Sequence, residues 1–382
     1  MGDGATARRS VRIGWALWAL YAVILSAVVA ATPHRHTVDA YREAAEAWSA
    51  KADLYELQTI HGFLYLPQAA AAFVPVTWFP YSVGQVLWRL AGLGLLAGAA
   101  WSLARTLDRR AAPWFLLFTL LLLPASFASA RNGQSNVHLA ACLLAFGIAL
   151  LQERWNLATC FLMAALVLKP VAAVPILLVG ALYGPMRLRL LLGLAVVALL
   201  PFLRPDWDYV ARQYHLCAQK MALAEEPGEH SFADFSGMLW TFGWRLPFAW
   251  IKGIGIVMAA GTLGLAWRAV RVDRRAAPLW IAALAGTYLM LFNPRTETNS
   301  YIILAATALP FVADAFWRRA RGEAGCLVFL MLALGSDSYG SPIYPWTNLW
   351  LKALVAIGFL VFLACRLATG KALFRGRPLP LA

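Results

Sequence analysis

The sequence predicts an all-α polytopic membrane protein, with residues 1–382 forming a single integral membrane domain. The chain is 61% hydrophobic and only 14% charged, whereas about a quarter of the residues of a soluble chain are charged. Apolar runs of about 20 residues, the length that crosses a bilayer as a helix, recur along the chain. Its basic residues form short clusters at the ends of these runs, as topology signals do. The net charge of +14 therefore indicates membrane topology rather than nucleic-acid binding.

The apolar runs predict about twelve crossings of the membrane. In chain order they are 13–31, 81–104, 113–129, 135–151, 156–168, 170–183, 187–203, 247–270, 276–292, 299–316, 324–335 and 348–367. Placing the basic clusters in the cytoplasm lets these crossings alternate without conflict and puts both termini inside the cell. We expect the first run to be a signal anchor, because it lacks a cleavage site of small residues.

Two segments are ambiguous. Residues 63–79 contain two prolines, and a full crossing there would put the basic cluster "RTLDRR" outside, so we expect a re-entrant or interfacial helix. Residues 156–183 are interrupted by Lys169-Pro170 and form either one long helix or a short hairpin. The hairpin keeps the cluster "RLR" in the cytoplasm.

This topology collects varied polar chemistry on the outer side. The first extracytoplasmic loop (32–80) and a large loop (204–246) lie there, with all six histidines. Because the chain contains no P-loop, GxGxxG, HExxH or GxSxG motif, a nucleotide-driven pump and a hydrolase are disfavoured. His34 and His36 lack further ligands for zinc, and the five cysteines form no metal motif, so neither a metal nor a cofactor is expected.

The first outer loop supplies carboxylates. Asp39, Glu43 and Glu46 fit one face of an amphipathic helix, and for Glu43 and Glu46 a solvated face is a sufficient explanation. Asp39 lies soon after the first crossing, where a general base acting on a hydroxyl would be useful.

The segment "SARNGQSNVH" places polar residues between two apolar runs. Arg131 ends one crossing, and Asn132 begins a turn. Gln134, Asn136 and His138 continue into the next crossing, where polar side chains are costly unless paired. They form either part of a functional site or a capped turn with interhelical hydrogen bonds.

Cations stand at two further outer junctions, Lys169 and Arg295. If these converge with Arg131, they suit a phosphate or pyrophosphate leaving group at the level of the lipid headgroups. Arg295 could instead form a surface pair with Glu297, which would contribute little. The candidates for contact with a sugar or an acceptor are Asn132, Gln134, Asn136, His138, Asp53, Tyr65, Glu297, Asn299 and Tyr301.

Four segments occur in a familiar order: "VDAYREAAEAW" with "ADLY" (38–55), "FLYLPQAAAAFVPVTWFP" (63–80), "RNGQSN" (131–136) and "LKPVAAVPILLV" (168–179). This order resembles glycosyltransferase family 87, the polyprenyl-phosphate-mannose-dependent mannosyltransferases of the GT-C superfamily. The resemblance covers roughly residues 13–310, and the "NGQSN" junction followed by "KP" is its most specific part. The segment "NPRTETNSY" stands where many members have a Ser-Pro/His pattern.

The resemblance implies a GT-C-like bundle in the cell (inner) membrane, with amphipathic helices in the first outer loop and an extracytoplasmic active site. A hexose, mannose in the family pattern, would pass from a polyprenyl-phosphate sugar to a hydroxyl of a glycolipid or glycan acceptor. Asp39 matches the loop carboxylate of the family, the general base. Asn132, Gly133, Gln134 and Asn136 match the "NGQ" junction, and Lys169 matches the lysine of the "KP" break.

A transporter or flippase of an anionic or glycolipid solute is the alternative, because it would also need convergent cations inside a helix bundle. Such a protein should carry polar groups near the middle of the membrane and two related halves. In this sequence the polar residues gather at one face and no internal repeat is visible, which favours the enzyme.

Overall fold

The computed structural model describes residues 2–31, 37–225, 232–293, 295–340 and 342–375, and the described residues form helices and connecting loops without strands. Each predicted crossing is helical. The matching helices are α1 (Gly2–Ala31), α4 (Tyr81–Leu107), α5 (Trp114–Arg131), α6 (Asn136–Leu151), α7 (Trp155–Leu168), α8 (Ala173–Leu182), α9 (Gly184–Leu199), α12 (Phe248–Val272), α13 (Ala277–Phe292), α14 (Ile302–Trp317), α15 (Arg321–Leu334) and α17 (Leu351–Ala368).

Seven helical segments of the described chain are long and apolar enough to cross a membrane, and four further apolar helices are shorter. The all-α multi-pass membrane architecture is therefore confirmed, while the number of about twelve crossings stays a prediction. Helices apolar on every side take the centre of a bundle. In α14, 89% of the span is buried, and α6 and α13 pack against it. In α12 only 6% of the span is buried, so this helix stands at the periphery.

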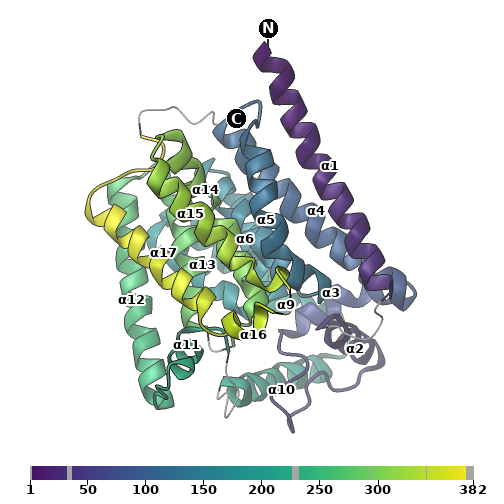
Figure 1. Cartoon of the computed structure of the whole chain (residues 1–382). Coiled ribbons are helices and arrows are strands. Elements are labelled where there is room, and N and C mark those ends of the chain that lie inside the picture. Colours follow the sequence, from purple (N-terminus) through teal and green to yellow (C-terminus); the bar gives the residue numbers. More distant parts are fainter. Residues whose placement is uncertain (1, 32–36, 226–231, 294, 341, 376–382) are drawn as a thin grey trace.

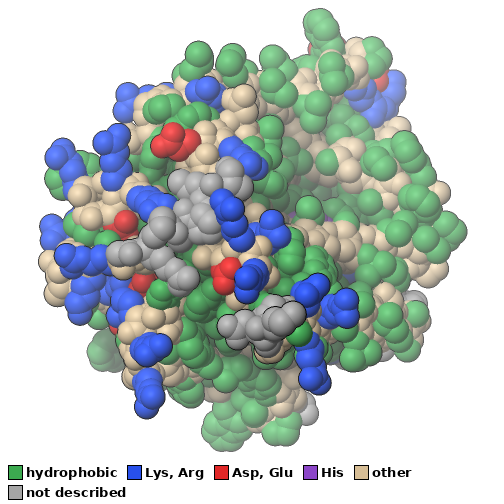
Figure 2. Space-filling model, turned by 90° about the horizontal axis from the view of Figure 1, so that it is seen from above, with side chains coloured by type: hydrophobic (Ala, Val, Ile, Leu, Met, Phe, Trp, Pro, Cys, Tyr) green, Lys and Arg blue, Asp and Glu red, His purple; other side chains and the backbone are tan. Residues whose placement is uncertain are grey.

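The two ends of the bundle differ (Figure 1). Both termini lie at one end, where Lys and Arg side chains gather over the surface (Figure 2). The remaining α-helices gather at the opposite end. They are α2 (Thr37–Ala50), α3 (Pro67–Thr77), α10 (Trp207–Glu225), α11 (Phe235–Thr241) and α16 (Tyr344–Thr347).

The segment 156–183 is a hairpin. Lys169 is extended, with φ −153° and ψ 132°, because the residue before a proline is disfavoured in helical conformation. A short 3₁₀ turn, η1 (Pro170–Ala172), then leads into α8. The rings of Trp155, at the start of α7, and Tyr183, just after α8, have centroids 6.2 Å apart, so the chain returns to the end from which α7 started.

The segment 63–79 forms α3, a helix of 11 residues that is too short for a crossing. It begins at Pro67, at a position where proline is well tolerated, and it packs against α2. Pro80 then separates it from α4. A short helix that packs against α2 and does not cross the bundle is the arrangement expected for an interfacial or re-entrant helix.

Amphipathic helices fill both of the large predicted loops. On α2 the side chains of Tyr41, Ala45 and Trp48 are buried, whereas Glu43 and Glu46 are exposed, as the sequence pattern predicts. On α10 the buried residues include Gln213 and Lys220. Both helices therefore lie across the end of the bundle with one face toward the protein.

Candidate functional site

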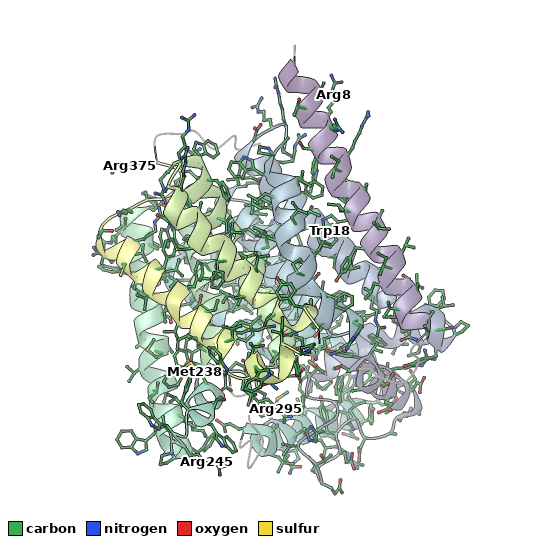
Figure 3. The ribbon with its side chains drawn as sticks, in the orientation of Figure 1. Arg8, Trp18, Met238, Arg245, Arg295 and Arg375 are labelled. Carbon is green, nitrogen blue, oxygen red and sulfur yellow. The ribbon has the colours of Figure 1, made fainter. Side chains whose placement is uncertain are left out.

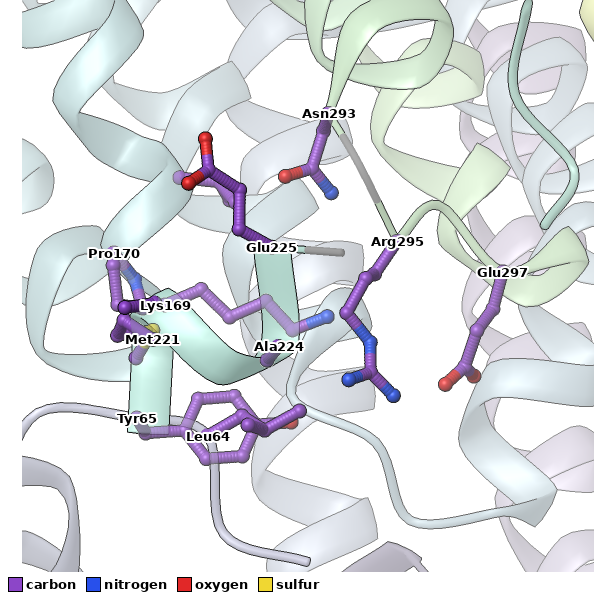
Figure 4. Close-up of a pocket in the computed structure, with 12 residues that line it drawn as sticks. Leu64, Tyr65, Lys169, Pro170, Met221, Ala224, Glu225, Asn293, Arg295 and Glu297 are labelled. Carbon is purple, nitrogen blue, oxygen red and sulfur yellow. The ribbon is translucent and has the colours of Figure 1, made fainter. Parts of the chain in front are cut away.

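A cavity of about 360 Å³ lies at the end of the bundle opposite the termini, and Figure 4 shows the residues that line it. Four segments that lie far apart in the sequence line it: Leu64 and Tyr65 of the first loop, residues 169–171 at the break after α7, the last turns of α10, and Asn293, Arg295 and Glu297 after α13. Figure 3 shows Arg295 near this end, far from Arg8 and Arg375 at the other. The position agrees with the end at which the sequence places the site.

Lys169 extends into this cavity, and its ammonium group points toward Arg295 (Figure 4). Because Pro170 ends α7, the lysine leaves the helix in extended conformation with its side chain directed into the cavity. Among the described residues, the structure gives the ammonium neither a hydrogen-bond nor an ion-pair partner. Burial lowers the pKa of Lys169, and the nearby Glu297 carboxylate partly opposes this shift.

Arg295 is the second cation of the cavity. One of its terminal nitrogens, Nη1, donates a hydrogen bond to the carbonyl oxygen of Ile60 at 2.6 Å, and the ring of Phe232 lies 5.2 Å from the guanidinium carbon. Burial lowers the pKa of Arg295, and Glu297 opposes the shift. Held by these contacts, the guanidinium lies between the end of Lys169 and Glu297 (Figure 4).

Glu297 completes the charged part of the cavity. Its carboxylate accepts a hydrogen bond from Nε2 of Gln134 at 2.5 Å, while Arg295 donates to Ile60 instead. Arg295 and Glu297 are therefore not the surface ion pair that the sequence left open. Together with Lys169 they place two cations and one carboxylate around a single space, which suits a ligand that carries both a phosphate and hydroxyl groups.

The "NGQSN" junction contacts the cavity through the hydrogen bond between Gln134 and Glu297. Besides its bond to Glu297, Gln134 Nε2 lies 3.4 Å from Oγ1 of Thr37, at the start of α2. Nδ2 of the fully buried Asn136 donates to Oε1 of Gln134 at 2.5 Å, to Oγ of Ser300 at 3.2 Å and to Oδ1 of Asn299 at 3.4 Å. Asn136 and Asn299 thus make the interhelical hydrogen bonds that were the alternative to ligand binding.

An aromatic pair links α2 to the cavity. The ring of Tyr41 stacks on Tyr65, with centroids 4.7 Å apart, and Tyr65 lines the cavity. The Tyr41 hydroxyl donates to Oγ of Ser135 at 2.8 Å, which also ties this helix to the "NGQSN" junction. A movement of α2 would therefore also displace Tyr65 in the lining of the cavity.

Asp39 lies on another side of α2. Its carboxylate accepts a hydrogen bond from the Tyr81 hydroxyl at 2.5 Å, at the start of α4, and it lies in the field of the Arg89 guanidinium. Residues two apart on a helix point in nearly opposite directions, so Asp39 and Tyr41 face different neighbours. Asp39 is half-buried and is not among the residues that line the cavity.

The other predicted site residues lie outside the cavity. Arg131 is exposed, with its guanidinium carbon 6.0 Å from the Phe127 ring, so of the three expected cations only Lys169 and Arg295 meet. His138 is buried between α4 and α6, and its ring stacks on Trp88 at 3.9 Å.

Three predicted site residues remain. Asn132 is half-buried at the turn. Asp53 and Tyr301 form hydrogen bonds within the protein. Asp53 accepts hydrogen bonds from Arg212 at 2.5 Å and Gln213 at 3.1 Å on α10. Tyr301 is fully buried and donates to the carbonyl oxygen of Ala233 at 2.7 Å.

The sequence interpretation missed two residues of α4 that hold the "NGQSN" junction. Arg89 donates to the carbonyl oxygens of Ala130 and Arg131, both at 3.0 Å, and Trp88 Nε1 donates to the carbonyl oxygen of Gly133 at 2.9 Å. An arginine inside an apolar segment was the available signal, because such a charge is buried only with partners. The lining residues of α10 and Asn293 were also missed, since nothing in their types marks them.

Among the described residues, no group of three or more His, Cys, Asp or Glu side chains could hold a metal ion. His34 and His36 lie outside the described residues. Asp206, one of two aspartates in the segment "RPDWDYV" (204–210) of the large loop, pairs with Lys51 at 2.8 Å and with Arg204 at 3.2 Å.

The family model of glycosyltransferase family 87 matches residues 63–294, more than half of the chain. The chain belongs to glycosyltransferase family 87. The match makes this protein a membrane glycosyltransferase, with a sugar donor and an acceptor as substrates. It runs from α3 to the end of α13 and includes Lys169, whereas Asp39 and Arg295 lie outside it. A search of curated proteins found no match to this family 87 chain.

Proposed function

We propose that this family 87 glycosyltransferase transfers a hexose, mannose in the first instance, from a polyprenyl-phosphate sugar to a hydroxyl of a glycolipid or glycan acceptor. One observation carries the proposal: Lys169 and Arg295 meet in a single cavity at one end of a membrane bundle. A lipid-linked donor would bring its phosphate to that depth, where paired cations stabilise it best.

The proposed topology has about twelve crossings, both termini in the cytoplasm and the cavity on the extracytoplasmic face of the cell membrane. It is supported by the gathering of Lys and Arg side chains at the end that carries the termini (Figure 2). The opposite end carries the amphipathic helices α2 and α10, which suit the boundary between lipid and water.

The proposed reaction is a single displacement. The acceptor oxygen forms a bond with the anomeric carbon while the bond from that carbon to the phosphate oxygen breaks, and the bonding electrons stay with the phosphate. Lys169 and Arg295 would stabilise the negative charge that grows on this oxygen. Glu297, Tyr65 and Asn293 line the same cavity and are available to the sugar hydroxyls.

The proton of the acceptor hydroxyl needs a base, for which we propose Asp39 on the family pattern. The hydrogen bond that the Tyr81 hydroxyl donates to Asp39 orients the Asp39 carboxylate and leaves further lone pairs of this carboxylate available. Glu297 is the competing carboxylate, because it lines the cavity directly. No metal or other cofactor is part of the proposal.

The test is a transfer assay with purified protein, radiolabelled polyprenyl-phosphate mannose and a membrane extract as the source of acceptor. We expect Asp39→Asn to lower kcat about a hundredfold or more, the usual effect of losing a general base. If Asp39→Asn transfers normally and Glu297→Gln does not, Glu297 is the base. Absence of transfer from any polyprenyl-phosphate sugar would contradict the proposed reaction and favour a transporter.

A further inference from the structure

A second cavity, of about 270 Å³, lies beside the first between α12 and α13. Its walls are largely apolar. The apolar lining residues are Phe235, Phe248, Ile251, Gly255, Ile256, Leu291 and Phe292. It shares Glu225 and Asn293 with the charged cavity, so the two spaces adjoin. We call this second space the α12–α13 groove.

The groove lies on the lipid-facing side of the bundle. Only 6% of the α12 span is buried, and Ile256 in the groove wall is 71% exposed. Gly255 lines the groove, and a Cβ at this position would meet nothing within 4 Å. Its carbonyl oxygen accepts a hydrogen bond from the Tyr288 hydroxyl at 3.2 Å. An apolar molecule in the groove could therefore continue into the surrounding lipid.

The polar groups of the groove already have partners. Glu225 at the end of α10 pairs with Lys252 at the start of α12, at 2.9 Å. Asp234 caps α11, where its carboxylate accepts hydrogen bonds from the Gly237 amide at 2.9 Å and the Ser236 hydroxyl at 2.7 Å. Because these groups are satisfied within the protein, the space they leave suits an apolar occupant rather than a second polar ligand.

We infer that the α12–α13 groove binds the isoprenoid units next to the phosphate of the lipid-linked donor. The inference rests on the proposed function and assigns the part of the protein that recognises the lipid. With the phosphate between Lys169 and Arg295, the chain passes Glu225 and Asn293, enters the groove and leaves along α12 into the membrane. The donor is the occupant because its anionic head belongs in the adjoining cavity, which holds the two cations.

The test compares two identical substitutions on opposite faces of α12. Gly255→Leu places a side chain in the groove, whereas Gly253→Leu places it on the outer face, beside Trp250 and Val257. Both positions have free space for a Cβ, so both variants should fold. KM is measured for a long-chain donor, decaprenyl-phosphate mannose, and for a donor without isoprene units, methyl-phosphate mannose.

We expect Gly255→Leu to raise KM for the long-chain donor about tenfold, the effect of leaving about two methylene groups unburied. The difference between the two donors should shrink in this variant and persist in Gly253→Leu. Ile256→Trp, which fills the groove from an exposed position, should repeat the effect if Gly255→Leu folds poorly. An equal effect of both glycine substitutions on both donors would overturn the inference.

A second readout needs no sugar transfer. Decaprenyl phosphate with a diazirine in its phosphate-proximal isoprene units should label peptides of α12 and α13 in the wild type and label them less in Gly255→Leu. Labelling of the groove without sugar transfer would contradict the proposed reaction and support the proposed lipid-binding groove. Sugar transfer with labelling only outside the groove would support the reaction and contradict the groove.

Discussion

At the residue scale, Lys169 is the residue on which the phosphate assignment depends most. Lys169→Met keeps much of the apolar stem and removes the charge, so we expect KM for the lipid-linked donor to rise about tenfold to a hundredfold. Lys169→Arg should restore most of the affinity. Donor titrations of both variants check this, and a wild-type KM in Lys169→Met would exclude the lysine from the donor site.

The pH dependence of donor binding follows from the same residue. Because burial lowers the pKa of Lys169, its charge is lost on going to alkaline pH earlier than the charge of an ordinary lysine, whose pKa is about 10.4. Donor affinity should therefore fall as pH rises and be fully present at lower pH. In Lys169→Arg this alkaline fall should move to higher pH. KM for the lipid-linked donor, measured across alkaline pH for the wild type and for Lys169→Arg, checks the direction of this change.

Gly133 in the "NGQSN" junction gives a stability prediction. Its φ is +68°, and a Cβ there would approach Nη2 of Arg89 and Cβ of Val38 to 2.9 Å. We expect Gly133→Ala to destabilise the protein by about 1–3 kcal/mol, because backbone strain and crowding act together. Gly98→Ala is the matched control, since Gly98 lies in α4 with free space for a Cβ. Thermal unfolding in detergent should show a lower midpoint for Gly133→Ala alone.

Single residues also mark the limit of what the sequence could predict about the site. The place of Lys169 in the cavity was predictable, because a lysine before a proline at the end of an apolar helix has few structural roles, whereas its role in phosphate binding stays a prediction. Arg131 and His138 were chosen for their types, yet one points to the surface and the other packs on Trp88. The direction of a side chain depends on neighbours from distant segments, and sequence spacing does not contain them.

At the scale of the element, α10 fastens the first outer loop to the cavity. The ammonium of the buried Lys220 donates to the carbonyl oxygens of Glu56 and Thr59, and Arg295 holds the next carbonyl, that of Ile60. We expect Lys220→Met to destabilise the protein by about 1–3 kcal/mol, since it leaves two carbonyls of a packed loop without this donor. Hydrogen exchange should increase in this loop.

Lys51→Met provides the control for that substitution. Lys51 is 57% exposed and pairs with Asp206 at the surface, where such a pair contributes about 0–1 kcal/mol. Equal losses in the two variants would mean that Lys220 acts only as a surface charge.

Helices themselves were the most predictable elements. Each apolar run became a helix, and the break at Lys169-Pro170 became a hairpin, because hydropathy and proline act locally. The packing of α10 over the cavity was not predictable, since its hydrogen-bond partners include residues of the segment 52–65, far away in the chain.

At the scale of the whole molecule, the arrangement of charge predicts how the protein lies in the membrane. If the end with the termini faces the cytoplasm, an exposed residue of α2 is accessible from outside the cell and the loop between α4 and α5 is not. In intact cells, a membrane-impermeant maleimide should label Glu43→Cys and leave Arg109→Cys unlabelled, because both side chains are exposed but lie at opposite ends.

The positions of the native cysteines make this labelling decisive. Of the native cysteines, Cys142 and Cys217 are buried. Cys160, Cys326 and Cys365 are exposed, but they lie on apolar helices where lipid would cover them, so the wild-type background should be low. Permeabilisation of the membrane should expose Arg109→Cys and add little label to Glu43→Cys. The reverse pattern in intact cells would place the cavity of Lys169 and Arg295 on the cytoplasmic side. A donor presented on the outer face could then not reach these two cations.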